Sequence, residues 1–396
     1  MFLVFGFGPI AAGLFLYEAQ ISGAFDRLVV AYRNQSVIDA VRVNGGVFSL
    51  NIARADRVEQ VQVGPVEMYN VNSAKDRRKI IEAVSKAGEI ATALGSIKDY
   101  QTDAEGSVHR LLAKGLQTSV TPKAIYAAEN HNHAAEKLRQ TILLAGLGKA
   151  QLESIQFLNT VIGKMSVRVS NAASRGLEPI APNLSQAFLA ESFNHILVSQ
   201  VSLPSFKRGL RQFQEKPDLL PFEEAKLYGH NAVHALAAYL CLHLGLAHIR
   251  DLEAVPGALT FLRTAFIEES GAALVKKHAG VDALFTPQGY AAYAADLLKR
   301  MMNPFLNDSA ERVGRDPLRK LGWEDRLIGT MRVCLNQNEK PERFALGTAL
   351  AMRAADINAE GLLKLWPATR NEAAPVLNLI QTAQRRLSEL PPTNLL

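Results

Sequence analysis

The first half of the chain alternates short apolar runs with helical patterns. Residues 2–5 and 28–31 are apolar runs of strand length, and a helical pattern follows each of them, over 10–20 and 36–43. Gly23 stands where the first helix is expected to end. This alternation predicts a parallel sheet with helices on its faces.

Four further runs extend the pattern. Residues 89–93 and 124–128 are predicted to be buried strands, each with a helix before it. Residues 47–52 and 58–63 favour an antiparallel pair, which would be an excursion from the parallel order. The first 200 residues are therefore expected to form one α/β domain.

The pattern changes after about Pro221. Strand-like runs nearly vanish, and helical periodicity dominates in five segments: 225–244, 259–278, 290–302, 323–333 and 341–355. Pro204, Pro217 and Pro221 interrupt the chain where this change occurs. We therefore predict an α/β domain over residues 1–200 and a mainly α-helical domain over residues 201–396.

The composition is that of an ordinary globular protein of two domains. The 396 residues are 48% hydrophobic and 21% charged. No apolar run reaches the roughly 18 residues of a membrane helix, and the start of the chain lacks the basic segment and cleavage site of a signal peptide. Cys241 and Cys334 stand far apart, in neither a metal-binding nor a disulfide pattern. These features predict a cytoplasmic protein that does not enter a membrane.

The charge of the chain bears on its partners. The net charge of +6 is modest for this length, and the basic residues are spread along the chain. No basic tail or aromatic–basic alternation points to nucleic acid, and the excess positive charge favours a small anionic ligand instead. Neither a monomer nor a small homo-oligomer is excluded.

A dinucleotide-binding fingerprint follows the first predicted strand. Residues 6–11 have the spacing G-x-G-x-x-A, directly after a strand and at the start of a helix. Gly6 permits the tight turn, Gly8 lets the backbone approach a pyrophosphate, and Ala11 lets helix and strand pack closely. The motif predicts a Rossmann-type domain that binds NAD or NADP. A glycine-rich turn without a ligand would have the same spacing.

The residues after this motif and after the second strand refine the prediction. Pro9 and Ile10 begin the helix, whose free N–H groups would face the phosphates of the dinucleotide. The acidic residue that would bind the ribose hydroxyls of NAD is absent from the end of the second strand, where Tyr32 and Arg33 stand. A guanidinium there can pair with a 2′-phosphate, which favours NADP. The alternative is that Arg33 is a solvated loop residue.

A second constellation opens the helical domain. Lys226, Asn231 and His234 lie on one predicted helix, where Asn231 stands roughly 140° and His234 roughly 80° from Lys226 around the axis. Oxidation of an alcohol by hydride transfer needs a base for the hydroxyl proton, and a lysine shielded from water can serve. Asparagine and histidine N–H groups can hold the oxygen where negative charge develops, without a metal. A polar, exposed helix face would have the same spacing.

Several segments together resemble the polyol-specific long-chain dehydrogenases, and most closely the mannitol-1-phosphate 5-dehydrogenases among them. The resemblance spans nearly the whole chain and is densest after residue 225. It rests on the following segments: residues 5–8 with Gly13, Ala128-Glu129-Asn130, the Lys-x4-Asn-x2-His motif, 268–272, 303–306, 311–321 and 325–328.

The resemblance implies a function and roles for these residues. Lys226 would be the general acid–base, and Asn231 and His234 would bind and polarise the reacting oxygen. Glu129 and Asn130 would lie at the end of a sheet strand beside the cofactor. The family also implies a Rossmann-type first domain, a mainly helical second domain, a substrate cleft between them and no zinc.

The substrate is expected to be a polyol or sugar phosphate. Arg312 and Arg315 are three residues apart, so they can share a helix face and clamp a phosphate or hydroxyl group, and Pro317 is expected to end that helix. An ion-pair network with nearby acidic residues is the alternative for these arginines. Lys164 stands where the family has an arginine after a sheet strand, and it is the third residue predicted to bind substrate.

These features predict an NAD(P)-dependent oxidoreductase, with mannitol 1-phosphate and fructose 6-phosphate or a related pair as its substrates. The departures from the family leave two alternatives open. One is a paralogue with a different substrate. The other is a dinucleotide-binding protein that has lost catalysis and acts in sensing or scaffolding.

Overall fold

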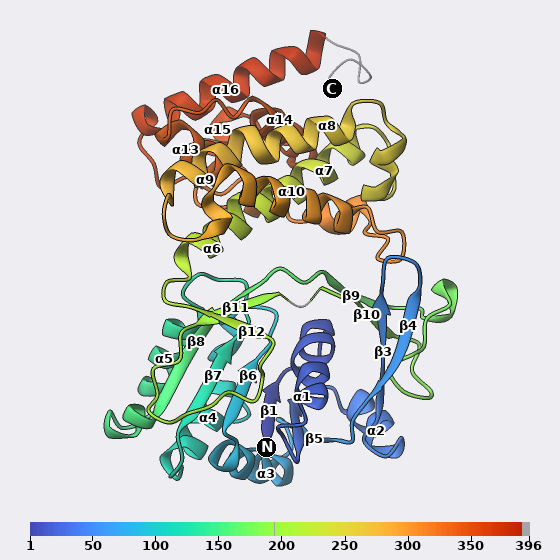
Figure 1. Ribbon diagram of the computed structural model, residues 1–396, viewed down its shortest axis with the longest axis vertical. Coiled ribbons are helices and arrows are strands. Elements are labelled where there is room, and N and C mark those ends of the chain that lie inside the picture. The colour runs from blue at the N-terminus through green and yellow to red at the C-terminus, as the bar shows by residue number, and fades with distance from the viewer. Residues whose placement is uncertain (194, 390–396) are drawn as a thin grey trace. The chain divides into compact units, whose positions relative to one another are not determined.

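The structure is a computed structural model that describes residues 1–193 and 195–389. The chain forms two compact units, Met1–Leu219 and Leu220–Leu396 (Figure 1). The division falls later than the boundary expected near residue 200, because strand β12 (Phe213–Lys216) still belongs to the sheet of the first unit.

One large sheet organises the first unit. Its strands are, in spatial order, β12, β11 (Ile196–Ser199), β8 (Ile155–Ile162), β7 (Lys123–Ala127), β6 (Glu89–Thr92), β1 (Phe2–Phe5), β2 (Leu28–Tyr32) and β5 (Val66–Asn70). Neighbouring strands are parallel from β8 to β5, whereas β11 is antiparallel to β8. The parallel strands have the order of a Rossmann-type fold, with β1 at the centre, and this part of the predicted fold class is confirmed.

Helices cover both faces of this sheet, so its central strands are continuous apolar runs rather than alternating ones. The helices of the first unit are the π-helix η1 (Ala11–Leu16), α1 (Tyr17–Ser22), α2 (Gln35–Val43), α3 (Ala74–Lys86), α4 (Val108–Gln117) and α5 (Ala134–Leu144), with short 3₁₀ segments η2 (Ile97–Tyr100), η3 (Ala150–Ser154) and η4 (Ala173–Arg175). One core includes side chains of η1 and α2, and the other includes side chains of α3, α4 and α5.

A second, smaller sheet completes the first unit. Its strands are β4 (Val58–Val63), β3 (Phe48–Ala53), β10 (Ala187–Glu191) and β9 (Ser166–Val169). The predicted antiparallel pair is confirmed as β3 and β4. Its partners β9 and β10 come from far along the chain, and β10 runs parallel to β3. The sequence pattern did not predict this sheet, because its central pairing joins residues more than a hundred positions apart.

The second unit is built from helices, which confirms the rest of the predicted fold class. Its α-helices are α6 (Leu220–Glu224), α7 (Asn231–His243), α8 (Ala258–Thr264), α9 (Ala272–Lys277), α10 (Pro287–Met301), α11 (Ala310–Gly314), α12 (Pro317–Lys320), α13 (Ile328–Asn336), α14 (Glu342–Ala355), α15 (Ala359–Leu365) and α16 (Arg370–Glu389). Two π-helices, η5 (Ala225–His230) and η7 (Ala265–Gly271), and two 3₁₀ segments, η6 (Ile249–Ala254) and η8 (Ala283–Phe285), connect them. The helix predicted over 323–333 begins only at Ile328, because turns occupy the residues before it.

No helix in the described part of the chain is long and apolar enough to cross a membrane.

Gly13 lets the first helix pack against the small sheet. It lies in η1, between the large sheet and strands β3 and β10 (Figure 1). A Cβ atom at Gly13 would lie 2.9 Å from the Cβ of Ala190 and 3.3 Å from Cδ1 of Leu50. Only glycine therefore fits between this helix and the small sheet without a shift of the backbone.

We predict that Gly13→Ala destabilises the first unit by about 1–3 kcal/mol, because the added methyl group overpacks this contact. Urea unfolding followed by circular dichroism measures the effect. Gly88→Ala is the matched control, since a Cβ atom there meets nothing within 4 Å. Equal unfolding midpoints for Gly13→Ala and the unchanged protein would show that the packing around Gly13 accepts a methyl group without loss of stability.

Candidate active site

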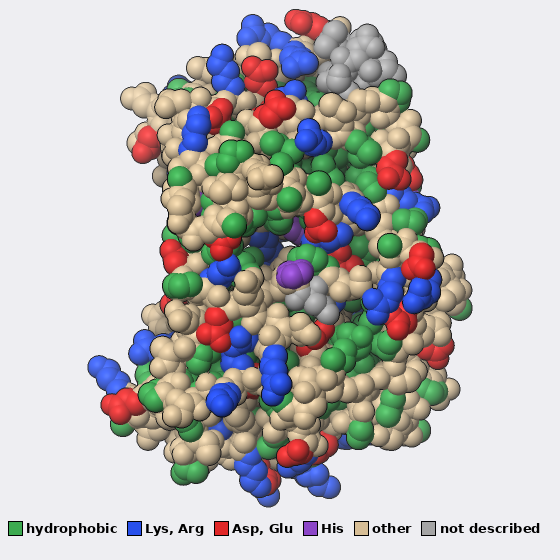
Figure 2. All heavy atoms as spheres, viewed as in Figure 1, with side chains coloured by type: hydrophobic (Ala, Val, Ile, Leu, Met, Phe, Trp, Pro, Cys, Tyr) green, Lys and Arg blue, Asp and Glu red, His purple; other side chains and the backbone are tan. Residues whose placement is uncertain are grey.

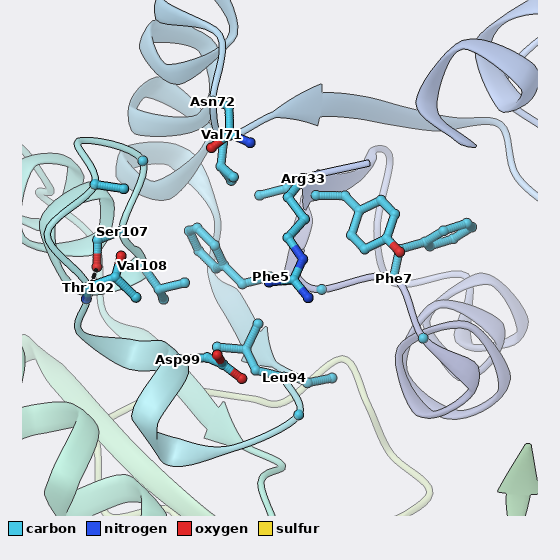
Figure 3. A pocket seen from close by; sticks show the side chains of 18 of the residues that line it. Phe5, Phe7, Arg33, Val71, Asn72, Leu94, Asp99, Thr102, Ser107 and Val108 are labelled. Carbon is cyan, nitrogen blue, oxygen red and sulfur yellow. Dashed lines mark hydrogen bonds between the residues drawn. The ribbon is translucent and has the colours of Figure 1, made fainter. Parts of the chain in front are cut away.

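A cavity of about 480 Å³ opens at the carboxyl ends of β1, β2, β5 and β6 in the first unit. This edge of a parallel sheet is where Rossmann-type folds bind dinucleotides. Figure 3 shows Arg33 within the space, with Asn72 and Val71 on one side and Leu94 and Asp99 on the other.

The glycine turn after β1 forms part of the cavity wall. Gly6 has φ +104°, and a Cβ atom there would lie 2.4 Å from the carbonyl oxygen of Ala93, so no other residue fits. Gly8 lines the same cavity, and a Cβ atom there would meet no other atom within 4 Å. The backbone at Gly8 is thus open to a ligand, as close approach of a pyrophosphate requires.

The other residues of the predicted fingerprint lie in the first turns of the helix. Ala11 is fully buried in η1, where it packs in the core between helix and sheet. Pro9 and Ile10 are half-buried at the helix start, and the N–H group of Ala12 donates to the carbonyl oxygen of Gly8 at 2.9 Å. These three residues shape the turn, while Gly6 and Gly8 line the cavity.

Tyr32 and Arg33 line the cavity at the end of β2. The side chain of Arg33 is exposed, and within residues 1–193 and 195–389 it forms no ion pair with a carboxylate. The guanidinium is therefore available to an anionic group of a bound ligand.

Glu129 stands apart from this cavity wall. It is buried, and its carboxylate accepts hydrogen bonds from the Leu94 N–H at 2.8 Å, from Thr92 Oγ1 at 2.9 Å and from the hydroxyl of Tyr100. Burial raises the pKa of the Glu129 carboxyl, and it also raises the pKa of Tyr100. Glu129 thus holds the loop that carries Leu94 in the cavity wall. Asn130 is exposed on the following turn.

The predicted acid–base residue lies in the second unit. Lys226 is half-buried in the π-helix η5, which runs directly into α7 with Asn231 and His234. The α-helical angles expected between these residues do not apply, because a π-helix bonds each N–H to the fifth preceding carbonyl. Desolvation and the positive charge of Arg326 lower the pKa of Lys226 to about 8, against the opposing charge of Glu223.

The charge of Arg326 acts on Lys226 because hydrogen bonds join η5 to the segment around the start of α13. The carbonyl oxygen of Tyr228 accepts a hydrogen bond from Thr330 Oγ1 at 3.2 Å, and the Tyr228 hydroxyl lies 3.4 Å from the carbonyl oxygen of Glu324. Arg326, in turn, donates from Nε to Asp325 at 2.8 Å. The same charge of Arg326 contributes to the lowered pKa values of three groups, which are Lys226, His230 and Lys320.

His234 lies next to a buried carboxylate. Its Nε2 lies 3.3 Å from Oδ2 of Asp308, and Asp308 also pairs with Arg312. Burial alone would raise the pKa of Asp308, but these two contacts outweigh it and lower the pKa to about 2. The ring of His230 lies 6.2 Å from the ring of His234, and burial lowers the pKa of His230 well below its ordinary value.

The two predicted clamp arginines differ in their surroundings. Arg312 lies in α11 and pairs with Asp308, as the ion-pair alternative expected, but its Nε is buried without a hydrogen-bond partner. Arg315 lies beyond the end of α11 and is exposed. The two do not share a helix face, since the helix ends at Gly314. Pro317 begins the next helix, α12, rather than ending this one.

Lys320 is a residue that the sequence analysis missed. It lies in α12 and is 2% exposed, and its Nζ has no hydrogen-bond partner. Desolvation and the charges of Arg326 and Arg319 lower its pKa to about 8. Lys320 and Arg326 both fall in segments already noted for the resemblance, so the signal was present, but the spacing did not single them out.

Lys164, the third residue predicted to bind substrate, lies in the first unit between β8 and β9. Only 7% of it is exposed, and its Nζ donates to the carbonyl oxygen of Phe193 at 3.1 Å. This contact fixes the connection between the two sheets. Among the described residues, no group of three or more His, Cys, Asp or Glu side chains is arranged to hold a metal ion.

Comparisons with known proteins identify the second unit. Residues 218–375 match the family model described as mannitol dehydrogenase C-terminal domain, and this range includes Lys226, Asn231, His234 and Arg326. The second unit therefore belongs to this domain family. The resemblance noted in the sequence is thereby confirmed at the level of the family, which does not distinguish the 5-dehydrogenases of mannitol 1-phosphate from other members.

Several solved dehydrogenase structures share the fold of this chain. A D-sorbitol dehydrogenase in substrate-free form matches 100% of the chain and 94% of its own length, with a TM-score of 0.79 and 12% identity. A mannitol 2-dehydrogenase from Pseudomonas fluorescens, in a ternary complex with NAD and D-mannitol, matches 100% of the chain and 93% of its own length, with a TM-score of 0.74 and 14% identity. A 2-dehydropantoate 2-reductase from Geobacter metallireducens has a TM-score of 0.51 and 15% identity over 89% of the chain and 100% of its own length.

The lowered pKa of Lys226 predicts how stability depends on pH. Its folded-state pKa is about 8, against an ordinary value of 10.5, so between these values the unfolded chain binds more protons and stability rises with pH. Lys226→Met removes this contribution. We therefore expect the unchanged protein to gain stability relative to Lys226→Met as pH rises from about 8 to about 10.5.

Urea unfolding followed by tryptophan fluorescence measures this difference, because both tryptophans, Trp323 and Trp366, lie in the second unit. Lys364→Met, at an exposed position of α15, is the control. If the free energies of unfolding of the unchanged protein and of Lys226→Met differed by the same amount across this pH range, the pKa of Lys226 would not be lowered in the folded state.

Proposed function

We propose that this chain is an NAD(P)-dependent oxidoreductase that interconverts a secondary alcohol and a ketone on a polyol or sugar phosphate. One observation carries the proposal. Lys226, whose pKa is lowered to about 8, lies on one continuous helical run with Asn231 and His234 in a mannitol dehydrogenase domain. The open glycine turn at Gly8 in the first unit fits the dinucleotide that such a reaction needs.

Lys226 is the general acid–base in this proposal. In alcohol oxidation its neutral Nζ accepts the hydroxyl proton while the carbinol carbon loses hydride. The nicotinamide ring, when bound, supplies the hydride acceptor. In ketone reduction the Lys226 ammonium returns the proton to the oxygen. A pKa near 8 makes both forms accessible close to neutral pH, which is the condition for efficient general acid–base catalysis.

Asn231 and His234 position the reacting oxygen. The asparagine amide and an N–H group of the imidazole are donors to an oxygen on which negative charge develops. His234 Nε2 lies 3.3 Å from Asp308 Oδ2 but forms no hydrogen bond with the described residues, so its N–H group is left for the reacting oxygen. Holding these donors in advance saves reorganisation at the moment of reaction.

The cationic surroundings of Lys226 favour an anionic substrate. Arg326 is close enough to affect the pKa of Lys226 and of Lys320, and the Nζ of Lys320 is buried without a partner. Arg312 adds a guanidinium whose Nε is likewise free of hydrogen bonds. A substrate phosphate offers the acceptors that these donors lack, as in the pair mannitol 1-phosphate and fructose 6-phosphate.

The cofactor is proposed to be NADP rather than NAD. The end of β2 carries no acidic residue, and Arg33 lines the cavity there without an acidic partner among the described residues. A guanidinium at this position suits a 2′-phosphate.

Replacing the proposed acid–base tests the mechanism. We expect Lys226→Ala to lower kcat by about 10²–10⁴, the range for loss of a general acid–base, while dinucleotide binding is retained. Small primary amines added to the assay should restore part of the rate. Steady-state kinetics at the nicotinamide absorbance band, with fructose 6-phosphate as substrate, measures both effects.

Two comparisons give this experiment its controls. Lys364→Ala, at an exposed lysine of the same unit, should leave kcat unchanged. Asn231→Ala should lower the rate without changing the shape of the pH profile. A near-normal rate for Lys226→Ala with its pH dependence intact would eliminate the proposed role. Dinucleotide binding without turnover of any ketose would instead favour a member of the family that has lost catalysis.

Substrate charge is tested separately. A phosphate held by partly buried cations should make kcat/KM for fructose 6-phosphate exceed that for fructose by about 10- to 100-fold. Lys320→Met should reduce this preference, and rising salt should raise KM for the phosphorylated substrate alone. Equal kcat/KM values for the two ketoses would exclude phosphate recognition.

A further inference from the structure

A second arginine lines the cavity beside Arg33. Arg168 belongs to β9 of the small sheet, and its side chain forms part of the cavity wall with Tyr32 and Arg33. Its Nη2 donates to the carbonyl oxygen of Phe7, in the glycine turn, at 2.6 Å and lies 3.4 Å from the hydroxyl of Tyr32. The small sheet thus delivers a cation to the end of β2.

The contacts of Arg168 leave its charge uncompensated. They are all with neutral groups: the Phe7 carbonyl, the Tyr32 hydroxyl, Oε1 of Gln186 at 3.2 Å and the ring of Phe188, whose centroid lies 5.2 Å from the guanidinium carbon. No carboxylate among residues 1–193 and 195–389 forms an ion pair with it. A guanidinium has five N–H donors, so these contacts leave donors for a further acceptor.

The position of Arg168 indicates which part of a bound dinucleotide it would contact. Tyr32 occupies the end of β2, where an acidic residue would bind the ribose hydroxyls of NAD. Arg168 contacts the hydroxyl of this same Tyr32, so its guanidinium lies on the side of the cavity where the adenosine ribose belongs. Together with Arg33 it makes this end of the cavity doubly cationic.

We propose that Arg168 and Arg33 together bind the 2′-phosphate of NADP, with Arg168 as the specificity residue contributed by the small sheet. This inference rests on the proposed use of a nicotinamide dinucleotide but not on turnover. A phosphate between two guanidinium groups receives charge-assisted hydrogen bonds from both, whereas NAD offers only hydroxyl groups at the same place.

Binding titrations separate this role from a merely structural one. The dissociation constants of NADPH and NADH are measured by cofactor fluorescence for the unchanged protein, Arg168→Met, Arg33→Met and the double variant. We expect each single variant to weaken NADPH binding by about 10- to 100-fold and NADH binding by much less. Arg57→Met is the control, because Arg57 is exposed and pairs with Asp56 outside the cavity.

Adenosine 2′,5′-bisphosphate and AMP extend the test to ligands without a pyrophosphate or nicotinamide. The proposal expects the bisphosphate to bind more tightly than AMP. This preference should fall in Arg168→Met and vanish in the double variant. An equal loss of NADPH and NADH affinity in Arg168→Met would overturn it, since that result indicates support of the glycine turn or a pyrophosphate contact. Tighter binding of NADH than NADPH by the unchanged protein would also overturn it. Neither result depends on Lys226, so failure of the proposed reaction remains distinguishable.

Discussion

The partial burial of Lys226, within range of the positive charge of Arg326, is the constraint on which the proposed chemistry depends. An ammonium group next to a guanidinium and shielded from water loses its proton more readily, and here the pKa of Lys226 falls to about 8. The arrangement is held in place by the packing of η5 against the segment that leads into α13, through Tyr228 and Thr330. A lysine with a lowered pKa next to further cationic groups suits an acid–base group or an anion site.

In the first unit, the packing keeps the backbone of the glycine turn after β1 accessible. Any side chain at Gly6 would collide with the carbonyl of Ala93. Gly13 lets the helix approach the small sheet. A Cβ atom at Gly8 would meet no other atom, so the backbone there is open. The buried carboxylate of Glu129 supports the cavity wall, because it accepts a hydrogen bond from the backbone of Leu94. Arg168 joins the same turn from the small sheet through the carbonyl of Phe7. The rigid parts of this unit thus surround the cavity that the dinucleotide is proposed to fill.

Local sequence patterns predicted what depends on local physics. The buried parallel strands, the glycine turn and the main helices follow from apolar periodicity and from conformations that only glycine adopts. The pairing of β10 with β3 was not predictable in this way, since it joins residues far apart in the chain. For the same reason nothing in the sequence drew attention to Arg168. The π-helix at Lys226 was not predicted, because its apolar pattern matches that of an α-helix. The role expected for Pro317 was wrong, because α11 ends at Gly314.

The pH dependence of hydride transfer tests the proposed acid–base most directly. Single-turnover rates of polyol phosphate oxidation, followed by absorbance of the reduced cofactor, are measured from about pH 6 to about pH 10. If neutral Lys226 accepts the proton, the rate rises about tenfold per pH unit and levels off near the lowered pKa of about 8. A rate that is flat across this range, or that rises in the same way in Lys226→Met, would contradict the assignment of Lys226 as the general acid–base.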